Sequence, residues 1–315
     1  MPIVKVSDIA YCRLQSPSLD QAEEFLTSFG MKVAARTKDR LFMRGTDPSP
    51  RIHVTHLGPS KFIGLAYYVD TEEDLKKFAK APGATGIENV DEPGGGKRVR
   101  VKDPNGYDIE VVWGMQPVEK LPTRRNIVNT GEDKYKRVGE VMRLPRGPSE
   151  VKRIAHAVIM TQDARAKTQW YRDTLGFVCS DDVYVGTKDN VIASFNRCDR
   201  GEKYVDHHVF LCLEGPITGL NHVSFEVQSI DDVMLGHEHL VKANKYKHVW
   251  GIGRHLLGSQ VFDYWQDPWS RVHEHWADTD VLNNAAQANL WPAEEGLNSQ
   301  WGDPAPMEFI QHATP

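Results

Sequence analysis

The stretch that decides the fold is Ile154-Ala155-His156-Ala157, together with the helix-like segment Ala164–Phe177 (ARAKTQWYRDTLGF) that follows it. The same pattern occurs earlier, where Ile9-Ala10-Tyr11 is followed by Leu19–Met31 (LDQAEEFLTSFGM). In both segments apolar residues recur at helical spacing, and a glycine near the end fits a helix C-cap. The chain therefore contains an internal repeat whose unit begins as strand, helix and turn.

The repeat continues through a second strand in each copy. Gly64–Val69 matches His222–Val227, and each segment runs into the start of another helix. Both copies then close with an Asp-Pro turn and a strand whose glutamate, Glu110 or Glu274, stands seven residues after the aspartate. Alternating strand and helix signals of this kind predict an α+β protein.

The repeat divides the chain into four parts. The two copies predict an N-terminal domain at residues 1–115 and a C-terminal domain at 151–280. Residues 116–150 are rich in charge and proline, which is typical of a connecting segment. Residues 281–315 have little periodicity, so we expect a tail that wraps over the surface.

Composition narrows the classes of function. The 315 residues include 38 Lys+Arg and 43 Asp+Glu, a net charge of −5, which argues against nucleic-acid binding. No apolar run approaches the roughly 20 residues that cross a bilayer. Pro2–Ser16 carries charged residues where a signal peptide needs an apolar core, and the four cysteines form no CxxC pair. We expect a cytoplasmic protein without nucleic-acid or membrane partners.

Histidines are unevenly distributed between the two copies. Of 13 histidines, eleven follow residue 150. His156 and His222 lie on strands that correspond in the repeat, and Glu274 lies on the closing strand. Two imidazoles and one carboxylate from three strands, with open positions left over, suit a divalent redox metal, with Fe(II) first and Mn(II) next.

The first copy serves as an internal control for this ligand set. The residues equivalent to His156, His222 and Glu274 are Tyr11, Gly64 and Glu110, so two of the three ligands are missing. A structural requirement shared by both copies would have kept the same residue types. The alternative, that His156 is a buried core histidine with no metal, is weakened by the presence of His222 and Glu274 on the corresponding strands.

These residues resemble the type I extradiol ring-cleaving dioxygenases of the vicinal-oxygen-chelate superfamily, over nearly the whole chain to about residue 280. The resemblance implies two tandem vicinal-oxygen-chelate domains, each of paired βαβββ modules that form a cupped sheet around the site. It implies metal ligation by His156, His222 and Glu274, and insertion of both atoms of O2 into a substituted catechol or trihydroxybenzene with meta cleavage, in aromatic degradation. It also implies a homo-oligomer, a tetramer or larger.

Three further positions match the family. Its acid-base histidine, about 14 residues before the second ligand, falls on the pair His207-His208 and favours His208; successive strand residues point to opposite faces. The family's substrate-contacting histidine and tyrosine fall on His255 and Tyr264. A histidine that titrates near neutrality can take the proton that a catechol loses on binding and return it later. The alternatives are a surface histidine at 255 and a core tyrosine at 264.

Two departures from the family concern the substrate. Val158 stands where members acting on carboxylated catechols carry an asparagine, and Trp250 stands where an arginine for a substrate carboxylate would be sought. With Trp265, these residues predict an apolar, aromatic-rich pocket and a substrate without a charged side chain.

The remaining late histidines are assigned to structure or solvent. His273 and His275 flank Glu274 on its strand and should project away from the metal. His237, His239 and His248 are expected to be solvated on or near an amphipathic helix after Val227.

Two other functions compete with ring cleavage. A glyoxalase-like isomerase needs a fuller metal shell with ligands from paired modules, which the first copy lacks. A non-catalytic ligand-binding or resistance protein of the same superfamily has no reason to hold a complete triad. Metal analysis separates the last class from the enzymes, and oxygen uptake with catechol separates the two enzymes.

Overall fold

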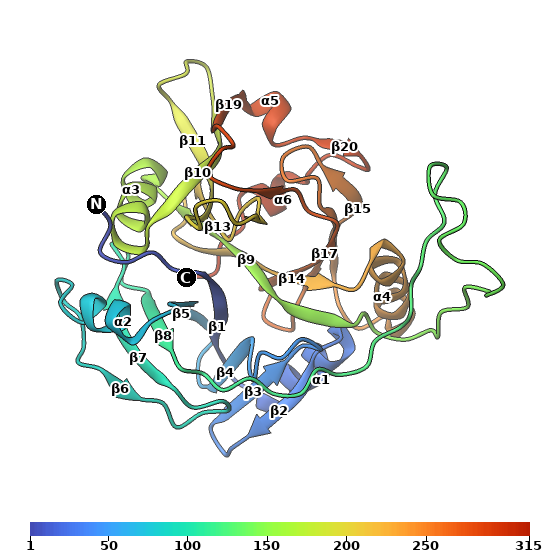
Figure 1. Ribbon diagram of the computed structural model, residues 1–315, viewed down its shortest axis with the longest axis horizontal. Helices are drawn as coiled ribbons and strands as arrows, with labels where there is room; N and C mark the ends of the chain where they lie inside the picture. The colour runs from blue at the N-terminus through green and yellow to red at the C-terminus, as the bar shows by residue number, and fades with distance from the viewer.

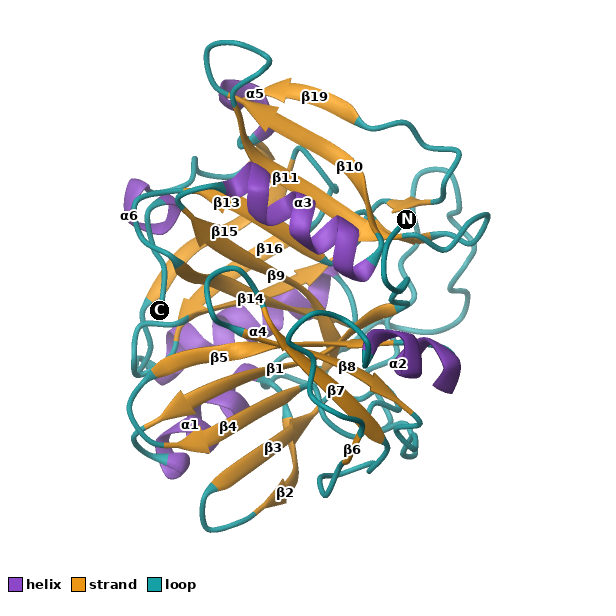
Figure 2. Cartoon of the chain, turned by 90° about the vertical axis from the view of Figure 1, so that its left-hand side faces the viewer, coloured by secondary structure: helices purple, strands orange, loops and turns teal.

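The computed structural model describes residues 1–315 and contains two large β-sheets, one above the other in Figure 2. The first sheet is formed by β1 (Asp8–Ser16), β2 (Lys32–Arg36), β3 (Arg40–Arg44), β4 (His53–Leu57), β5 (Lys61–Tyr68), β6 (Glu88–Asn89), β7 (Lys97–Lys102) and β8 (Asp108–Trp113). Its helices are α1 (Leu19–Phe29) and α2 (Glu72–Phe78). The strands lie in the order β2-β3-β4-β1-β5-β8-β7-β6.

The second sheet repeats this arrangement. Its main strands are β9 (Val151–Thr161), β10 (Phe177–Tyr184), β11 (Val191–Cys198), β13 (Phe210–Glu214), β14 (Gly219–Val227), β15 (His248–His255), β16 (Val261–Gln266) and β17 (Val272–Ala277). Its helices are α3 (Ala164–Leu175) and α4 (Ile230–Ala243). The order β10-β11-β13-β9-β14-β17-β16-β15 matches that of the first sheet strand for strand. The predicted α+β fold of tandem domains, each of two βαβββ modules, is confirmed.

Local capping explains where the repeated helices begin and end. The Ser18 hydroxyl accepts a hydrogen bond from the Gln21 amide at the start of α1, and the Asp163 carboxylate accepts one from the Ala166 amide at the start of α3. Gly30 and Gly176 follow the two helices with φ of 115° and 77°, a left-handed conformation that favours glycine. The predicted C-caps are confirmed.

The main hydrophobic core joins the two halves of the chain. It contains 44 buried residues drawn from both sheets and from α1 to α4. At its centre Phe29 of α1 stacks on His275 of β17, with ring centroids 3.6 Å apart, and meets Phe225 of β14 at 5.9 Å. One face of the second sheet is thus used for packing, which leaves the opposite face for a cavity.

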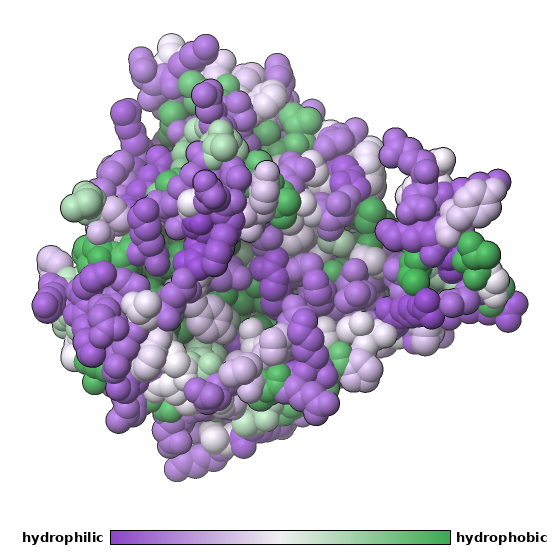
Figure 3. Space-filling view, in the orientation of Figure 1, coloured by the Kyte–Doolittle hydropathy of each residue, from purple (hydrophilic) through white to green (hydrophobic).

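The connecting segment lies outside both sheets. Residues 116–150 contain no helix or strand and project beyond α4, at the right of Figure 1 and of the largely hydrophilic surface in Figure 3.

None of the protein's helices has the length and apolar character needed to cross a membrane.

The tail is more than the surface wrap that its sequence predicts. Its elements are β18 (Val281–Leu282), β19 (Asn289–Pro292), α5 (Ala293–Gly296), β20 (Ser299–Trp301) and α6 (Met307–Ile310). β19 pairs with β10 and β20 pairs with β15, while β18 pairs with β12 (Val205–Asp206) outside the large sheets. An edge strand offers unpaired amide and carbonyl groups to any extended segment, whatever its side-chain pattern. Periodicity therefore does not reveal this pairing.

The closing glutamate of the first sheet is neutralised by arginine. Glu110 of β8 accepts hydrogen bonds from the Tyr11 hydroxyl, at 2.5 Å, and from Arg13 Nε, at 2.7 Å. Arg13 also pairs with Glu92 at 2.7 Å, and Arg51 lies 3.2 Å from the same carboxylate. All four charged side chains are at most 4% exposed. The position that corresponds to the predicted metal ligand Glu274 in the second copy is here part of a buried ionic network.

We expect Arg13→Ala to destabilise the protein by about 3–5 kcal/mol, because it leaves two buried carboxylates short of a partner. The midpoint of thermal or denaturant unfolding measures this change. Arg36→Ala removes an exposed arginine that pairs with Asp20 and Glu23, and it should leave the midpoint near that of the wild type. Equal losses in the two variants would show that burial of the network has no special weight.

Candidate metal centre and active site

Three neighbouring strands bring the predicted ligands together. β9, β14 and β17 lie side by side, and in their register Ser224 stands opposite His156 on one side and Glu274 on the other. His222 precedes Ser224 by two residues and therefore points to the same face. His156 Nε2 lies 3.0 Å from Glu274 Oε2, and His222 Nε2 lies 3.5 Å from the same oxygen. The ligand atoms are all within 4.8 Å of one another.

The charge state of this cluster fits a divalent cation. Glu274 is completely buried, and neither of its carboxylate oxygens has a hydrogen-bond partner; His222 Nε2 also lacks one. Burial opposes ionisation of Glu274, yet the facing imidazoles of His156, His255 and His222 hold its pKa well below the usual value. Burial lowers the pKa of His222 to about 3, so this imidazole is neutral. An ionised, unpaired buried carboxylate is costly without a cation.

The second ligand is oriented by its neighbour in the chain. His222 Nδ1 donates to Asn221 Oδ1 at 2.7 Å, which leaves Nε2 for a metal. The Asn221 amide donates in turn to the carbonyls of Phe309, at 3.0 Å, and His312, at 2.8 Å. The tail thus supports a metal-ligand candidate through one side chain.

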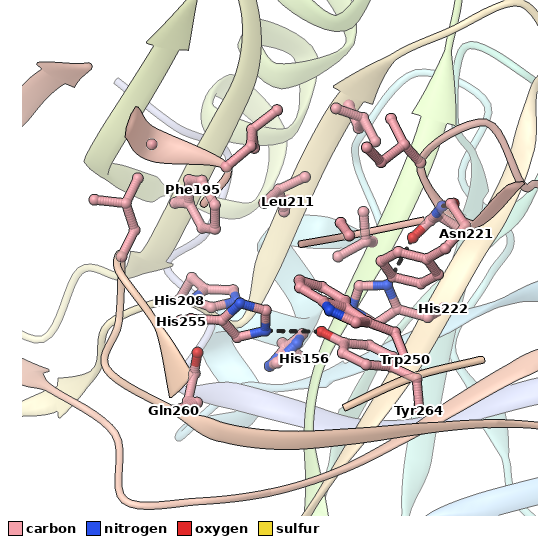
Figure 4. Close-up of a pocket in the computed structure, with 18 residues that line it drawn as sticks. His156, Phe195, His208, Leu211, Asn221, His222, Trp250, His255, Gln260 and Tyr264 are labelled. Carbon is pink, nitrogen blue, oxygen red and sulfur yellow. Dashed lines mark hydrogen bonds between the residues drawn. The ribbon is translucent and has the colours of Figure 1, made fainter. Parts of the chain in front are cut away.

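The other predicted site residues lie beside His156 and His222 (Figure 4). His255 Nε2 and the Tyr264 hydroxyl are 2.9 Å apart, and His255 Nε2 lies 3.6 Å from Glu274 Oε1. The ring of His208 packs against that of His156, with centroids 4.3 Å apart. All three side chains line the cavity beside the triad. Their placement agrees with the roles that the resemblance implies.

The pair His207-His208 is divided between two environments. Only His208 lines the cavity. His207 lies behind it, with Nδ1 3.1 Å from His208 Nδ1 and Nε2 2.7 Å from Asp181 Oδ2. Burial and the imidazoles of His156 and His207 lower the pKa of His208 well below its usual value. The geometry favours His208 over His207 as the residue that meets a substrate.

The cavity is mostly apolar. It has about 720 Å³ of empty space, part of it open to solvent, and its walls include Val158 and Trp250 as predicted. Trp265 does not line it, which corrects the prediction. Consecutive residues on a strand alternate in direction, so Tyr264 faces the cavity and Trp265 faces away, where its Nε1 donates to Asp263 Oδ2 at 2.6 Å.

The flanking histidines occupy the packing face of the sheet. His273 lies 3.4 Å from His53, measured between the Nε2 atoms, and His275 donates from Nε2 to the Phe29 carbonyl at 2.6 Å. Both point away from the triad, as predicted.

The prediction that His237 and His248 are solvated is wrong. Their ring nitrogens lie 3.1 and 2.8 Å from Asp263 Oδ1, and their side chains are 24% and 31% exposed. Because Asp263 is completely buried, its carboxylate needs several donors, and the two imidazoles and Trp265 supply them.

Sequence reasoning missed several residues of the site. Asn221 could have been found as the residue that precedes a ligand. Gln260 lines the cavity with both amide atoms buried and unpartnered, and Leu297 and Phe309 enter it from the tail. No local pattern marks these last three.

Comparison with known proteins identifies the family. Residues 153–269 match the Glyoxalase/Bleomycin resistance protein/Dioxygenase superfamily. Metapyrocatechase 2 from Cupriavidus necator is 31% identical over 317 residues, covering 98% of this chain and 92% of that protein. The chain belongs to the extradiol ring-cleaving dioxygenases. A manganese-dependent 2,3-dihydroxybiphenyl 1,2-dioxygenase from Geobacillus genomosp. 3 is 23% identical over 274 residues, covering 84% of this chain and 83% of that protein.

Solved structures share the fold of this extradiol dioxygenase. The substrate complex of homoprotocatechuate 2,3-dioxygenase from Brevibacterium fuscum has a TM-score of 0.81 at 20% identity, covering 99% of this chain and 94% of that chain. The Mn(II)-bound glyoxalase from Novosphingobium aromaticivorans has a TM-score of 0.79 at 21% identity, covering 99% and 96%. At such identities the likeness is one of fold, so it does not separate a dioxygenase from an isomerase. The relationship to metapyrocatechase 2 favours ring cleavage.

We expect Asn221→Ala in this dioxygenase to weaken metal binding by about 10–100-fold, because His222 loses the acceptor that fixes its ring. Titration of the metal-free protein with Co(II), followed by its visible spectrum, measures the affinity. Gln311→Ala is the matched control, since this exposed residue of the tail has no side-chain contact with Asn221 or His222. An unchanged affinity in Asn221→Ala would contradict the orienting role.

Proposed function

We propose that this dioxygenase uses Fe(II), held by His156, His222 and Glu274, to open the ring of a substituted catechol or trihydroxybenzene by meta cleavage in aromatic degradation. The observation that carries the metal assignment is the buried carboxylate of Glu274, ionised and without a hydrogen-bond partner between two imidazoles. Imidazole and carboxylate donors also suit Mn(II). The manganese-dependent relative keeps that metal as the second candidate.

We assign the chemistry around the metal to three side chains. When bound, the metal supplies a point at which catecholate and O2 are held side by side. His208 takes the proton that a catechol hydroxyl loses on binding. His255 and Tyr264, whose Nε2 and hydroxyl lie 2.9 Å apart, are placed to hydrogen-bond the substrate oxygens as their charge changes. Trp250 lies nearly parallel to the Tyr264 ring, at 11° and 5.3 Å, and shields this pair from water.

The lining of the cavity supports a substrate with an uncharged substituent. No lysine or arginine is among the residues of the wall, and Val158, Leu211 and Leu257 make one side of it apolar. A carboxylate placed there would lose its water without gaining a partner. Gln260 is the polar group of the wall that is left free to bond a neutral hydroxyl or carbonyl substituent.

We extend the proposal to the organisation of the chain. Residues 1–115 form a domain without a metal site, 116–150 connect it to the catalytic domain at 151–280, and 281–315 form the tail. We further propose a cytoplasmic homo-oligomer, a tetramer or larger. In the connecting segment Tyr135, Val138 and Val141 are 78%, 69% and 71% exposed, and a second copy would remove such apolar surface from water. Light scattering of the purified protein tests the oligomer.

Ring cleavage is tested with metal-free protein reconstituted anaerobically with Fe(II) or Mn(II) and given catechols in air. We expect one O2 consumed per catechol and a yellow ring-opened product. Alkyl- or aryl-substituted catechols should exceed carboxylated catechols in kcat/KM by about 100-fold or more, because the carboxylate is desolvated without a partner. Bound metal with no turnover of any catechol would refute the proposal.

We expect His208→Phe to lower kcat by about 10²–10⁴-fold, the usual contribution of a general acid-base group, with the metal content unchanged. His239→Phe is the control, because His239 lies on α4, outside the cavity. Steady-state kinetics with the best catechol measures both variants. Unchanged kinetics in His208→Phe would move the acid-base role to another residue.

A further inference from the structure

A line of buried hydrogen bonds runs from the cavity into the body of the second sheet. It begins at His208, continues through His207 and ends at Asp181 of β10. Trp291 of β19 donates from its indole Nε1 to the other oxygen of Asp181 at 2.9 Å. Among these four residues only His208 lines the cavity. The proposed ring-cleavage chemistry assigns no role to His207, Asp181 or Trp291.

The middle residue, His207, is fixed in place by hydrogen bonds of its backbone. The His207 amide donates to the Asp280 carbonyl at 2.9 Å, and its own carbonyl accepts from the Ser180 hydroxyl at 2.5 Å. His207 and His208 are both 3% exposed, and Asp181 is 5% exposed. The two imidazoles meet nearly at right angles, at 88°. Water therefore has little access to the nitrogens that face one another.

The direction of each hydrogen bond follows from the acceptor at the end. Burial opposes ionisation of Asp181, but the hydrogen bonds of His207 and Trp291 lower its pKa below the usual value, so the carboxylate only accepts. His207 Nε2 therefore carries the hydrogen that faces Asp181. In a neutral His207 this leaves Nδ1 as a bare acceptor, and His208 Nδ1, 3.1 Å away, must be the donor. His208 then has no hydrogen on Nε2.

We propose that Asp181 and His207 are positioning residues that hold His208 as the Nδ1–H tautomer, with Nε2 free to accept the proton of the substrate. The proposal rests on the acid-base role of His208 proposed above. In the step itself the catechol O–H bond breaks, an N–H bond forms at His208 Nε2, and the Nδ1–H bond to His207 is kept.

The alternative tautomer shows why the aspartate matters. Without a carboxylate acceptor, His207 can carry its hydrogen on Nδ1, facing His208. His208 must then accept at Nδ1 and hold its hydrogen on Nε2, where it can no longer take a proton from the substrate. In the Ser-His-Asp triad of serine proteases, replacing the aspartate that selects the tautomer lowers kcat by about 10⁴-fold. Here the selection passes through a second imidazole.

The kinetic test compares neighbours on one strand. Asp181→Asn should lower kcat by about 10–1,000-fold while KM and metal content stay within about 2-fold. Asp182→Asn is the control, since Asp182 contacts Cys179, Ser194 and Arg172 and should retain wild-type kinetics. His207→Leu should match Asp181→Asn. His207→Gln should recover part of the loss, because an amide can donate to Asp181 and accept from His208. Equal activity of Asp181→Asn and wild type at equal metal content overturns the proposal.

A direct measurement of the tautomer remains informative if the enzyme fails to cleave any catechol. The 15N shifts of labelled histidines in the Zn(II)-loaded protein should show His208 protonated on Nδ1 in the wild type and on Nε2 in Asp181→Asn. His208→Phe assigns the signal. The same His208 tautomer in both proteins would overturn the proposal, whereas loss of ring cleavage alone would overturn only the proposed function. A fall in kcat that follows metal loss in every variant would show a merely structural role and would also overturn it.

Discussion

The buried carboxylate at the end of the closing strand is the constraint on which the site depends. Glu274 is completely buried in the middle of the second sheet, and neither of its oxygens accepts a hydrogen bond. Such a group requires a cation. The first sheet meets the same requirement at Glu110 with a cation of its own, the guanidinium of Arg13, assisted by the Tyr11 hydroxyl. In the second sheet no lysine or arginine pairs with Glu274, and a metal held there with the imidazoles of His156 and His222 would supply the positive charge. The charge of the shared glutamate is thus balanced by arginine in the first copy, where it serves structure, and by a proposed metal in the second copy, where it serves reactivity.

Strand alternation separates chemistry from packing within single strands. On β17, Glu274 lies on the same face of the sheet as His156, whereas His273 and His275 on either side enter the core shared with the first half of the chain. On β16, Tyr264 faces the cavity while Asp263 and Trp265 bind each other behind it. Whether a side chain of these strands serves the site or the core therefore depends on the face of the sheet to which it points. Rigid packing on one face holds the reactive groups on the other to a fixed geometry.

Much of this could be predicted from the sequence because the repeat acts as an internal comparison. It located His156 and His222 as positions that differ between the two copies and Glu274 as the glutamate that both closing strands share. The fold itself followed from matching strands, helices and glycine caps. Trp265 was wrongly predicted to line the cavity, because it follows Tyr264 directly on the strand and therefore points to the opposite face of the sheet. His237 and His248 were expected in solvent because the buried acceptor that binds them, Asp263, lies in another element. The walls from Leu297 and Phe309 depend on long-range pairing at sheet edges, which leaves no periodic signal in the tail.

The place of the tail has a consequence for the order in which the protein is made. On the ribosome the proposed ligands His156, His222 and Glu274 emerge before Leu297 and Phe309, the tail residues that line the cavity. The carbonyls of Phe309 and His312, which anchor Asn221, emerge later still. A nascent chain that has passed β17 already contains all three proposed metal ligands, but it still lacks the tail residues that line the cavity. Metal capture can thus precede completion of the cavity wall during biosynthesis, and proteolytic removal of the residues after β18 would take away the part of the wall that includes Leu297 and Phe309 while sparing the proposed ligands.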